Sequence, residues 1–286
     1  LRKYSGRVIP WAKRCPPDPR MCPLIESLPA TLLIAALVAV ALIVYRRFDR
    51  RHPFPASLPN PAELTQGASI LVIVCMVASA ATAGVCYLVF GPENPIPATA
   101  VEPLLLPVPF AATLFVYIVT CAATGFYEEA AFRVVFQGLF ERGFAGNGVI
   151  PRRCVLFAAL LSSILFAVMH VITPIPEGAD LLHVGMQGVF KFLQGLLFGL
   201  VMTALLKRTG SLAVVAAIHM CYNLLFFLPW LAAAGSFPTT YLTGVSIDTI
   251  GLAITSICLV PAAVFSVRFL ACGGQVQRPS DGESPC

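Results

Sequence analysis

The chain has 286 residues, of which 58% are hydrophobic and 12% charged, and its formal net charge is +5. Its mean hydropathy is +0.83. A soluble domain carries about 25% charged residues, so a chain this long with so little charge cannot cover a soluble surface. The basic residues lie at the ends of apolar segments, which gives no indication of nucleic-acid binding. We expect an integral membrane protein whose solvent is the lipid bilayer.

The apolar residues form blocks that are each about one bilayer long. A spanning helix needs roughly 20 mainly apolar residues, and a lone span must satisfy its own backbone hydrogen bonds, which favours helices. The sequence therefore predicts an all-α fold, a polytopic transmembrane helical bundle of about seven to eight spans. The predicted spans are 28–45, 67–90, 109–124 with its continuation, 154–172, 186–206, 211–231 and 245–271.

The placement of Lys and Arg predicts the topology. Basic residues follow the first, third, fifth and last of these spans, whereas the loops 91–102, 173–185 and 232–244 contain none. By the positive-inside rule, these loops should be extracytoplasmic and the C-terminus cytoplasmic. The N-terminal segment is basic although seven spans place it outside; either the natural start is Met21 or a span is miscounted. A high ratio of Arg to Lys suggests a bacterial cytoplasmic membrane.

Polar residues within apolar segments concentrate in the middle of the chain. We therefore divide it into an N-terminal basic segment with two spans (1–108), a catalytic core (109–231) and a last span with a polar tail (232–286). Ionisable side chains inside a membrane are costly and usually functional. This core contains six of them, with an asparagine beside them: Glu128, Glu129, Arg133, His170, Lys191, His219 and Asn223.

The two adjacent glutamates are expected to have different environments. Glu129 and Arg133 are four residues apart on a helix and can pair, whereas Glu128 points about 100° away from Glu129. One carboxylate is then neutralised while the other faces elsewhere. The alternative is a solvated helix end with a purely structural ion pair.

Two histidines and the asparagine should reach the same depth as Glu128. His219 and Asn223 lie on one helix face, and the distances of His170, His219, Asn223 and Glu128 from the basic end are roughly 16–25 Å. One intramembrane cavity can therefore hold all four. The predicted helix that carries Glu128 would be about 51 Å long, which is longer than the bilayer core is thick. We therefore expect a tilt, a break near Gly125 or extra length outside the membrane.

Lys191 lies near the predicted extracytoplasmic end of its span, where snorkelling to the interface is the expected explanation. The spacing of Gly195 and Gly199 on the same helix favours close helix packing.

Three short motifs in order resemble those of the CPBP family, which includes the type II CAAX prenyl endopeptidases. They are Glu128-Glu129-Ala-Ala-Phe-Arg133, Phe166-Ala-Val-Met-His170 and His219-Met-Cys-Tyr-Asn223. The resemblance implies a conical intramembrane cavity and an endopeptidase in which Glu128 and His170 activate water. It further implies an oxyanion site from His219 and Asn223, with support from Glu129, Arg133 and Phe166. The expected substrate is a membrane-associated peptide or protein, without asserted CAAX specificity.

Three other functions compete with this one. In a metalloprotease, Glu128, His170 and His219 would bind zinc. We nevertheless expect no cofactor, because the sequence has no His-Glu-x-x-His helix. A non-catalytic scaffold or bacteriocin-immunity protein would use the same fold to bind a membrane partner. A transporter ranks last, because no inverted repeat or pair of broken helices is visible.

Overall fold

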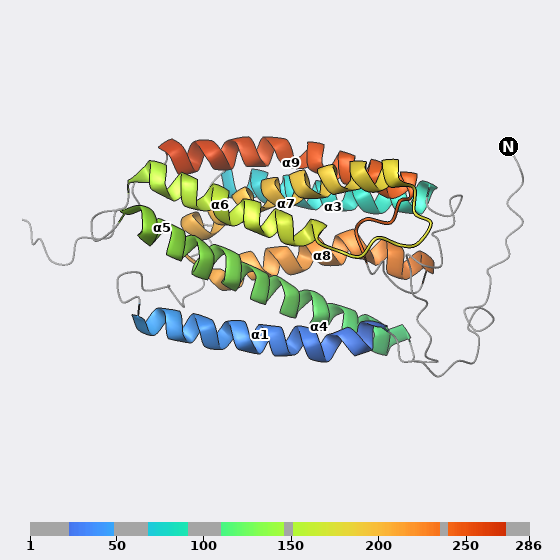
Figure 1. The fold of residues 1–286 in the computed structure, drawn as a ribbon, viewed down its shortest axis with the longest axis horizontal. Coiled ribbons are helices and arrows are strands. Elements are labelled where there is room, and N and C mark those ends of the chain that lie inside the picture. Colours follow the sequence, from blue (N-terminus) through green and yellow to red (C-terminus); the bar gives the residue numbers. More distant parts are fainter. Residues whose placement is uncertain (1–22, 49–67, 91–109, 146–150, 235–239, 273–286) are drawn as a thin grey trace, which may run out of the picture.

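The computed structural model describes residues 23–48, 68–90, 110–145, 151–234 and 240–272, which contain helices and no strand. Figure 1 shows these helices packed side by side along one axis. In chain order they are α1 (Pro23–Phe48), α3 (Ala68–Phe90), α4 (Phe110–Glu129), the π-helical segment η3 (Ala130–Phe136), α5 (Gln137–Ala145), α6 (Arg152–Val171), α7 (Leu181–Thr209), α8 (Leu212–Ala234) and α9 (Ser246–Cys272).

The predicted membrane bundle is confirmed. Six described helices are long and apolar enough to cross a bilayer, namely α1, α3, α6, α7, α8 and α9. They coincide with six of the predicted spans. The remaining one is α4, whose 20 residues pack between α1 and α8. The N-terminal segment, the loop 91–102 and the polar tail lie outside the described residues.

Basic residues gather at one end of this bundle. The C-terminal ends of α1, α5, α7 and α9 and the start of α6 all lie at the same end of the molecule (Figure 1). These helix ends carry Arg47, Arg142, Arg152, Arg153, Lys207, Arg208 and Arg268. The alternation in the sequence of loops with and without Lys or Arg therefore corresponds to a basic end of the fold and an end without these residues in the described loop 173–185.

The helix that carries the glutamates continues without the break that was considered near Gly125. It runs through α4 into η3 and α5, and its irregularity is the π-helical turn directly after Glu129. Gly125 instead permits close packing, because a Cβ there would lie 2.8 Å from the Ala216 carbonyl oxygen on α8. π-Helical turns are rare and occur frequently at functional sites. The departure from regular helix is thus located beside the two carboxylates.

The predicted close packing at the glycines of α7 is confirmed. A Cβ at Gly195 would lie 3.0 Å from Ala167 Cα, and one at Gly199 would lie 2.6 Å from Ser163 Oγ. Both neighbours belong to α6. The backbones of α6 and α7 can therefore approach closely, as small residues allow in membrane helices, and this contact fixes the position of His170 at the end of α6.

Candidate active site

A cavity of about 190 Å³ lies inside the bundle, and all four predicted catalytic residues line it. They come from three helices: Glu128 from α4, His170 from α6, and His219 and Asn223 from α8. Phe166, predicted as a supporting residue, also lines the cavity. The predicted convergence of these side chains on one cavity is therefore confirmed, whereas their catalytic roles stay predictions.

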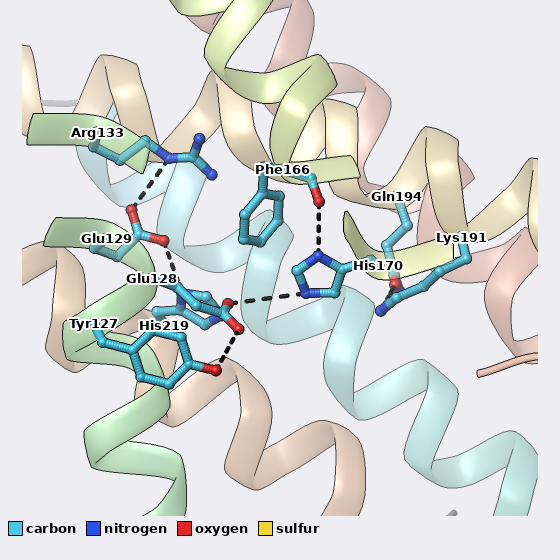
Figure 2. Close-up of polar contacts among 9 residues, drawn as sticks. All are labelled: Tyr127, Glu128, Glu129, Arg133, Phe166, His170, Lys191, Gln194 and His219. Carbon is cyan, nitrogen blue, oxygen red and sulfur yellow. Dashed lines mark hydrogen bonds and ion pairs between the residues drawn. The ribbon is translucent and has the colours of Figure 1, made fainter. Parts of the chain in front are cut away.

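Glu128 presents one carboxylate oxygen to two imidazole rings. Its Oε2 atom lies 3.5 Å from His219 Nε2 and 3.9 Å from His170 Nε2. Its Oε1 atom accepts a hydrogen bond from the Tyr127 hydroxyl at 3.3 Å, as Figure 2 shows. Glu128 is 8% exposed, and Oε2 is buried without a hydrogen-bond partner in the described part of the chain. Buried polar atoms of this kind are rare in native proteins and call for a functional explanation.

Glu129 faces away from Glu128 and pairs with two groups. One oxygen lies 3.3 Å from Arg133 Nε, and the two side chains are fully buried. The other lies 2.7 Å from His219 Nδ1. A carboxylate oxygen accepts, so Nδ1 of His219 carries a proton and donates it to Glu129. The expected ion pair of Glu129 with Arg133 is present. The hydrogen bond to Glu129 orients His219 with Nε2 toward Glu128.

His170 is oriented by its own helix. Its Nδ1 atom donates to the Phe166 carbonyl oxygen at 2.8 Å, because a carbonyl can only accept. In the neutral ring, Nε2 then carries the lone pair, and this atom faces Glu128 (Figure 2). The Phe166 ring fills the space beside it, 4.2 Å from the His170 ring and 4.6 Å from the Arg133 guanidinium carbon. Phe166 thus separates the arginine from the histidine.

Asn223 lies one helical turn beyond His219 and lines the same cavity. Its main-chain carbonyl accepts a hydrogen bond from the buried Tyr117 hydroxyl at 3.1 Å, and the same hydroxyl reaches the Leu224 carbonyl at 2.8 Å. Tyr117 comes from α4, so these bonds join α4 to α8 close to the asparagine. The turn of α8 that presents Asn223 is therefore held from outside the helix.

The snorkelling expected for Lys191 is wrong. Its side chain is 7% exposed and lines the cavity instead of reaching the end of its span. Nζ donates to Gln194 Oε1 at 2.8 Å and lies 3.6 Å from the centre of the Tyr241 ring. The hydrogen bond to Gln194 and the contact with the distant residue Tyr241 keep the ammonium group inside the cavity. The position of Lys191 within its span does not reveal these contacts.

Tyr241 covers the cavity from the segment that precedes α9. Its ring lies 6.0 Å from the His170 ring. The segment is anchored by Gln187 of α7, which donates to the Thr243 hydroxyl at 3.2 Å and accepts from the Gly244 amide at 2.9 Å. Burial raises the pKa of the Tyr241 phenol above its ordinary value, so its hydroxyl stays protonated. No pattern in the sequence indicates Tyr241, because it lies outside the predicted spans and far along the chain from Lys191.

The metal-dependent alternative requires Glu128, His170 and His219 to bind one zinc ion. A zinc ion requires three or four ligand atoms about 2.0–2.2 Å from one point. Within the residues that the structure describes, no group of three His, Cys, Asp or Glu side chains is placed to hold a metal ion. Zinc binding by Glu128, His170 and His219 stays an alternative that the chelator experiment below decides, and the reaction proposed below uses no metal.

Fold and site together define a helical membrane protein with a buried carboxylate–histidine centre. Residues 110–225 match the family model described as type II CAAX prenyl endopeptidase Rce1-like. The similar segment covers less than half of the chain and extends from the start of α4 to just beyond Asn223. A search of curated proteins and a search of solved structures gave no match.

Proposed function

We propose that this protein is an intramembrane endopeptidase that hydrolyses a peptide bond of a membrane-associated peptide or protein. The observation that carries the proposal is the approach of Glu128 Oε2 to His170 and His219 inside a buried cavity. A separation of 3.9 Å between Glu128 and His170 is too long for a direct hydrogen bond, but it suits two groups that share one water molecule.

In the proposed reaction, Glu128 and Nε2 of His170 bind the nucleophilic water and take one of its protons. The water oxygen bonds to the carbonyl carbon, and the carbonyl electrons move to oxygen. The carbonyl double bond then re-forms as the carbon–nitrogen bond breaks, and the proton taken from water passes to the leaving nitrogen, which departs as an amine. General base catalysis of this kind requires the base within hydrogen-bond reach of the proton that it removes.

His219 and Asn223 are proposed to stabilise the oxyanion, with a proton on each ring nitrogen of His219 so that Nδ1 donates to Glu129 and Nε2 donates to the oxyanion. Preorganised donors aimed at developing negative charge are commonly the largest catalytic contribution. The hydrogen bond from His219 Nδ1 to Glu129 fixes the ring with Nε2 toward the cavity, and Arg133 balances the charge on Glu129. Glu129 and Arg133 are thus positioning residues, because they act through His219 and touch no substrate atom.

The basic end of the bundle is proposed to face the cytoplasm, which places the C-terminus there as well. The membrane is proposed to be the bacterial cytoplasmic membrane. A protease-cleavable tag after residue 286 should resist externally added protease in intact spheroplasts and be cut after lysis. Cleavage of that tag before lysis would reverse the orientation.

The test of the activity compares wild type with Glu128→Gln and His170→Ala on a peptide library in liposomes, with and without a chelator. We expect both variants to lose cleavage and the chelator to have no effect. Loss of wild-type cleavage with chelator would establish the metalloprotease. If neither wild type nor Glu128→Gln cleaves a peptide and both support the same cellular phenotype, the scaffold or immunity function is favoured.

A further inference from the structure

Lys191 is a second ionisable group in the cavity, and the proposed hydrolysis does not use it. Its Nζ atom donates one hydrogen bond, to Gln194 Oε1 at 2.8 Å. Gln194 in turn donates from Nε2 to the Tyr222 hydroxyl at 3.2 Å, which turns its oxygen toward the lysine. An ammonium group has three N–H donors. Two donors therefore remain for a ligand that enters the cavity.

The ammonium group has no carboxylate within ion-pair distance among the described residues, although the Glu128 carboxylate of the same cavity attracts it electrostatically. Among the ion pairs of the described residues, within 4.0 Å, none includes Lys191. The other described lysine, Lys207, lies 2.7 Å from a Glu141 oxygen. Lys191 instead lies against the faces of Tyr241 and Phe226, at 3.6 Å and 5.6 Å from the ring centres. Such contacts stabilise a cation only partly, whereas an unpaired buried charge is costly.

The lysine lies at a useful place relative to the reacting groups. In Figure 2, His170 stands between Glu128 on one side and Lys191 with Gln194 on the other. All four residues line the same cavity. A peptide whose scissile carbonyl is held at Glu128 and His170 can therefore extend along the cavity to the ammonium group.

We propose that Lys191 and Gln194 form a subsite that binds a carboxylate of the peptide substrate, close to the scissile bond. This inference rests on the endopeptidase function proposed above and adds a specificity-determining residue to it. One lysine with aromatic walls suits a small monoanion, whereas phosphate is commonly held by several donors. The carboxylate is either the free C-terminus of the peptide or an Asp or Glu side chain within it.

The first test measures kcat/KM for matched pairs of peptides that end in a free acid or in an amide, with and without an internal Asp. We expect wild type to prefer the carboxylate-bearing member by about 10-fold or more, as a charge-assisted hydrogen bond provides. Lys191→Met should bring this ratio close to one, and Lys191→Arg should retain part of it. The control Lys207→Met removes a lysine outside the cavity and should keep the wild-type ratio.

The pattern of preference identifies the source of the carboxylate. Preference for acid over amide indicates the C-terminus, and preference for internal Asp irrespective of the terminus indicates a side chain. Equal ratios in wild type and Lys191→Met would overturn the subsite while leaving the protease intact.

A second measurement keeps the inference testable if no peptide is cleaved. Binding of the same peptides, fluorescently labelled, is measured by anisotropy to Glu128→Gln and to the double variant Glu128→Gln/Lys191→Met. Acid peptides should bind the single variant about 10-fold more tightly, and the advantage should vanish in the double variant. If Glu128→Gln binds acid peptides selectively but wild type cleaves none of them, the protease is refuted and the subsite is supported. If no peptide binding depends on Lys191, the subsite is refuted.

Discussion

The contact between Gly199 and Ser163 should control both stability and the position of His170. In Gly199→Ala, the new Cβ would lie 2.6 Å from Ser163 Oγ and 2.7 Å from Ser163 Cβ. These distances are too short for van der Waals contact, so α6 and α7 must move apart. Overpacking of this kind typically costs about 1–3 kcal/mol. Because α6 also carries Phe166 and His170, the same displacement should lower the rate of cleavage.

A matched control lies on the same helix. A Cβ at Gly185 meets nothing within 4 Å, so Gly185→Ala gains the same helix propensity of about 1 kcal/mol without the clash. The difference in free energy of unfolding between the two variants then isolates the steric cost, at about 1–3 kcal/mol. Thermal or denaturant unfolding in detergent micelles measures it.

A double variant tests whether the stated contact is responsible. Ser163→Gly removes the two nearest atoms that a Cβ at position 199 would meet and leaves Ser163 Cα at 3.1 Å, so Gly199→Ala should cost less in that background. We expect a coupling free energy of about 1 kcal/mol or more, together with partial recovery of cleavage. Equal stability of Gly199→Ala and Gly185→Ala would refute the reasoning about helix packing.

Three further predictions concern the polar groups of the site. Glu129→Gln should lower the free energy of unfolding by about 3–5 kcal/mol, because it leaves Arg133 as an unpaired buried charge. Unfolding measurements on the double variant Glu129→Gln/Arg133→Met should show that part of this stability is restored. Cleavage should stay low in both variants, because His219 loses its charged acceptor. Tyr127→Phe removes one hydrogen bond to Glu128 and should lower kcat by about 2- to 10-fold, with a smaller change in KM; an unchanged kcat would remove Tyr127 from the site. Incubation with a chelator, followed by metal analysis and assay, should leave cleavage unchanged.

Sequence reasoning located the residues of the site because the decisive signals are local. The ion pair of Glu129 with Arg133 follows from their spacing of four residues, and the distance of each polar residue from the basic end predicted their shared depth. Both results depend only on the periodicity of a helix. The three motifs added an expected role for each side chain.

The remaining features depend on contacts between distant segments. The orientation of Lys191 is determined by Gln194 on its own helix and by Tyr241 on another segment, and its place near a span end favoured the wrong expectation. The π-helical turn after Glu129 has no composition signal, since Ala130–Phe136 is an ordinary apolar helical sequence with one arginine. Tertiary structure alone brings Tyr241 to the cavity.

The most direct test of the account is hydrolysis in water enriched in oxygen-18. Purified wild type in liposomes is incubated with the peptide library, and new C-termini are analysed by mass spectrometry beside Glu128→Gln and Glu141→Gln. Glu141 is a buried control carboxylate that pairs with Lys207 outside the cavity. The account predicts label in the new C-termini with wild type and Glu141→Gln but no products with Glu128→Gln. Equal labelled product from Glu128→Gln would contradict the assignment of Glu128 as the base that activates water.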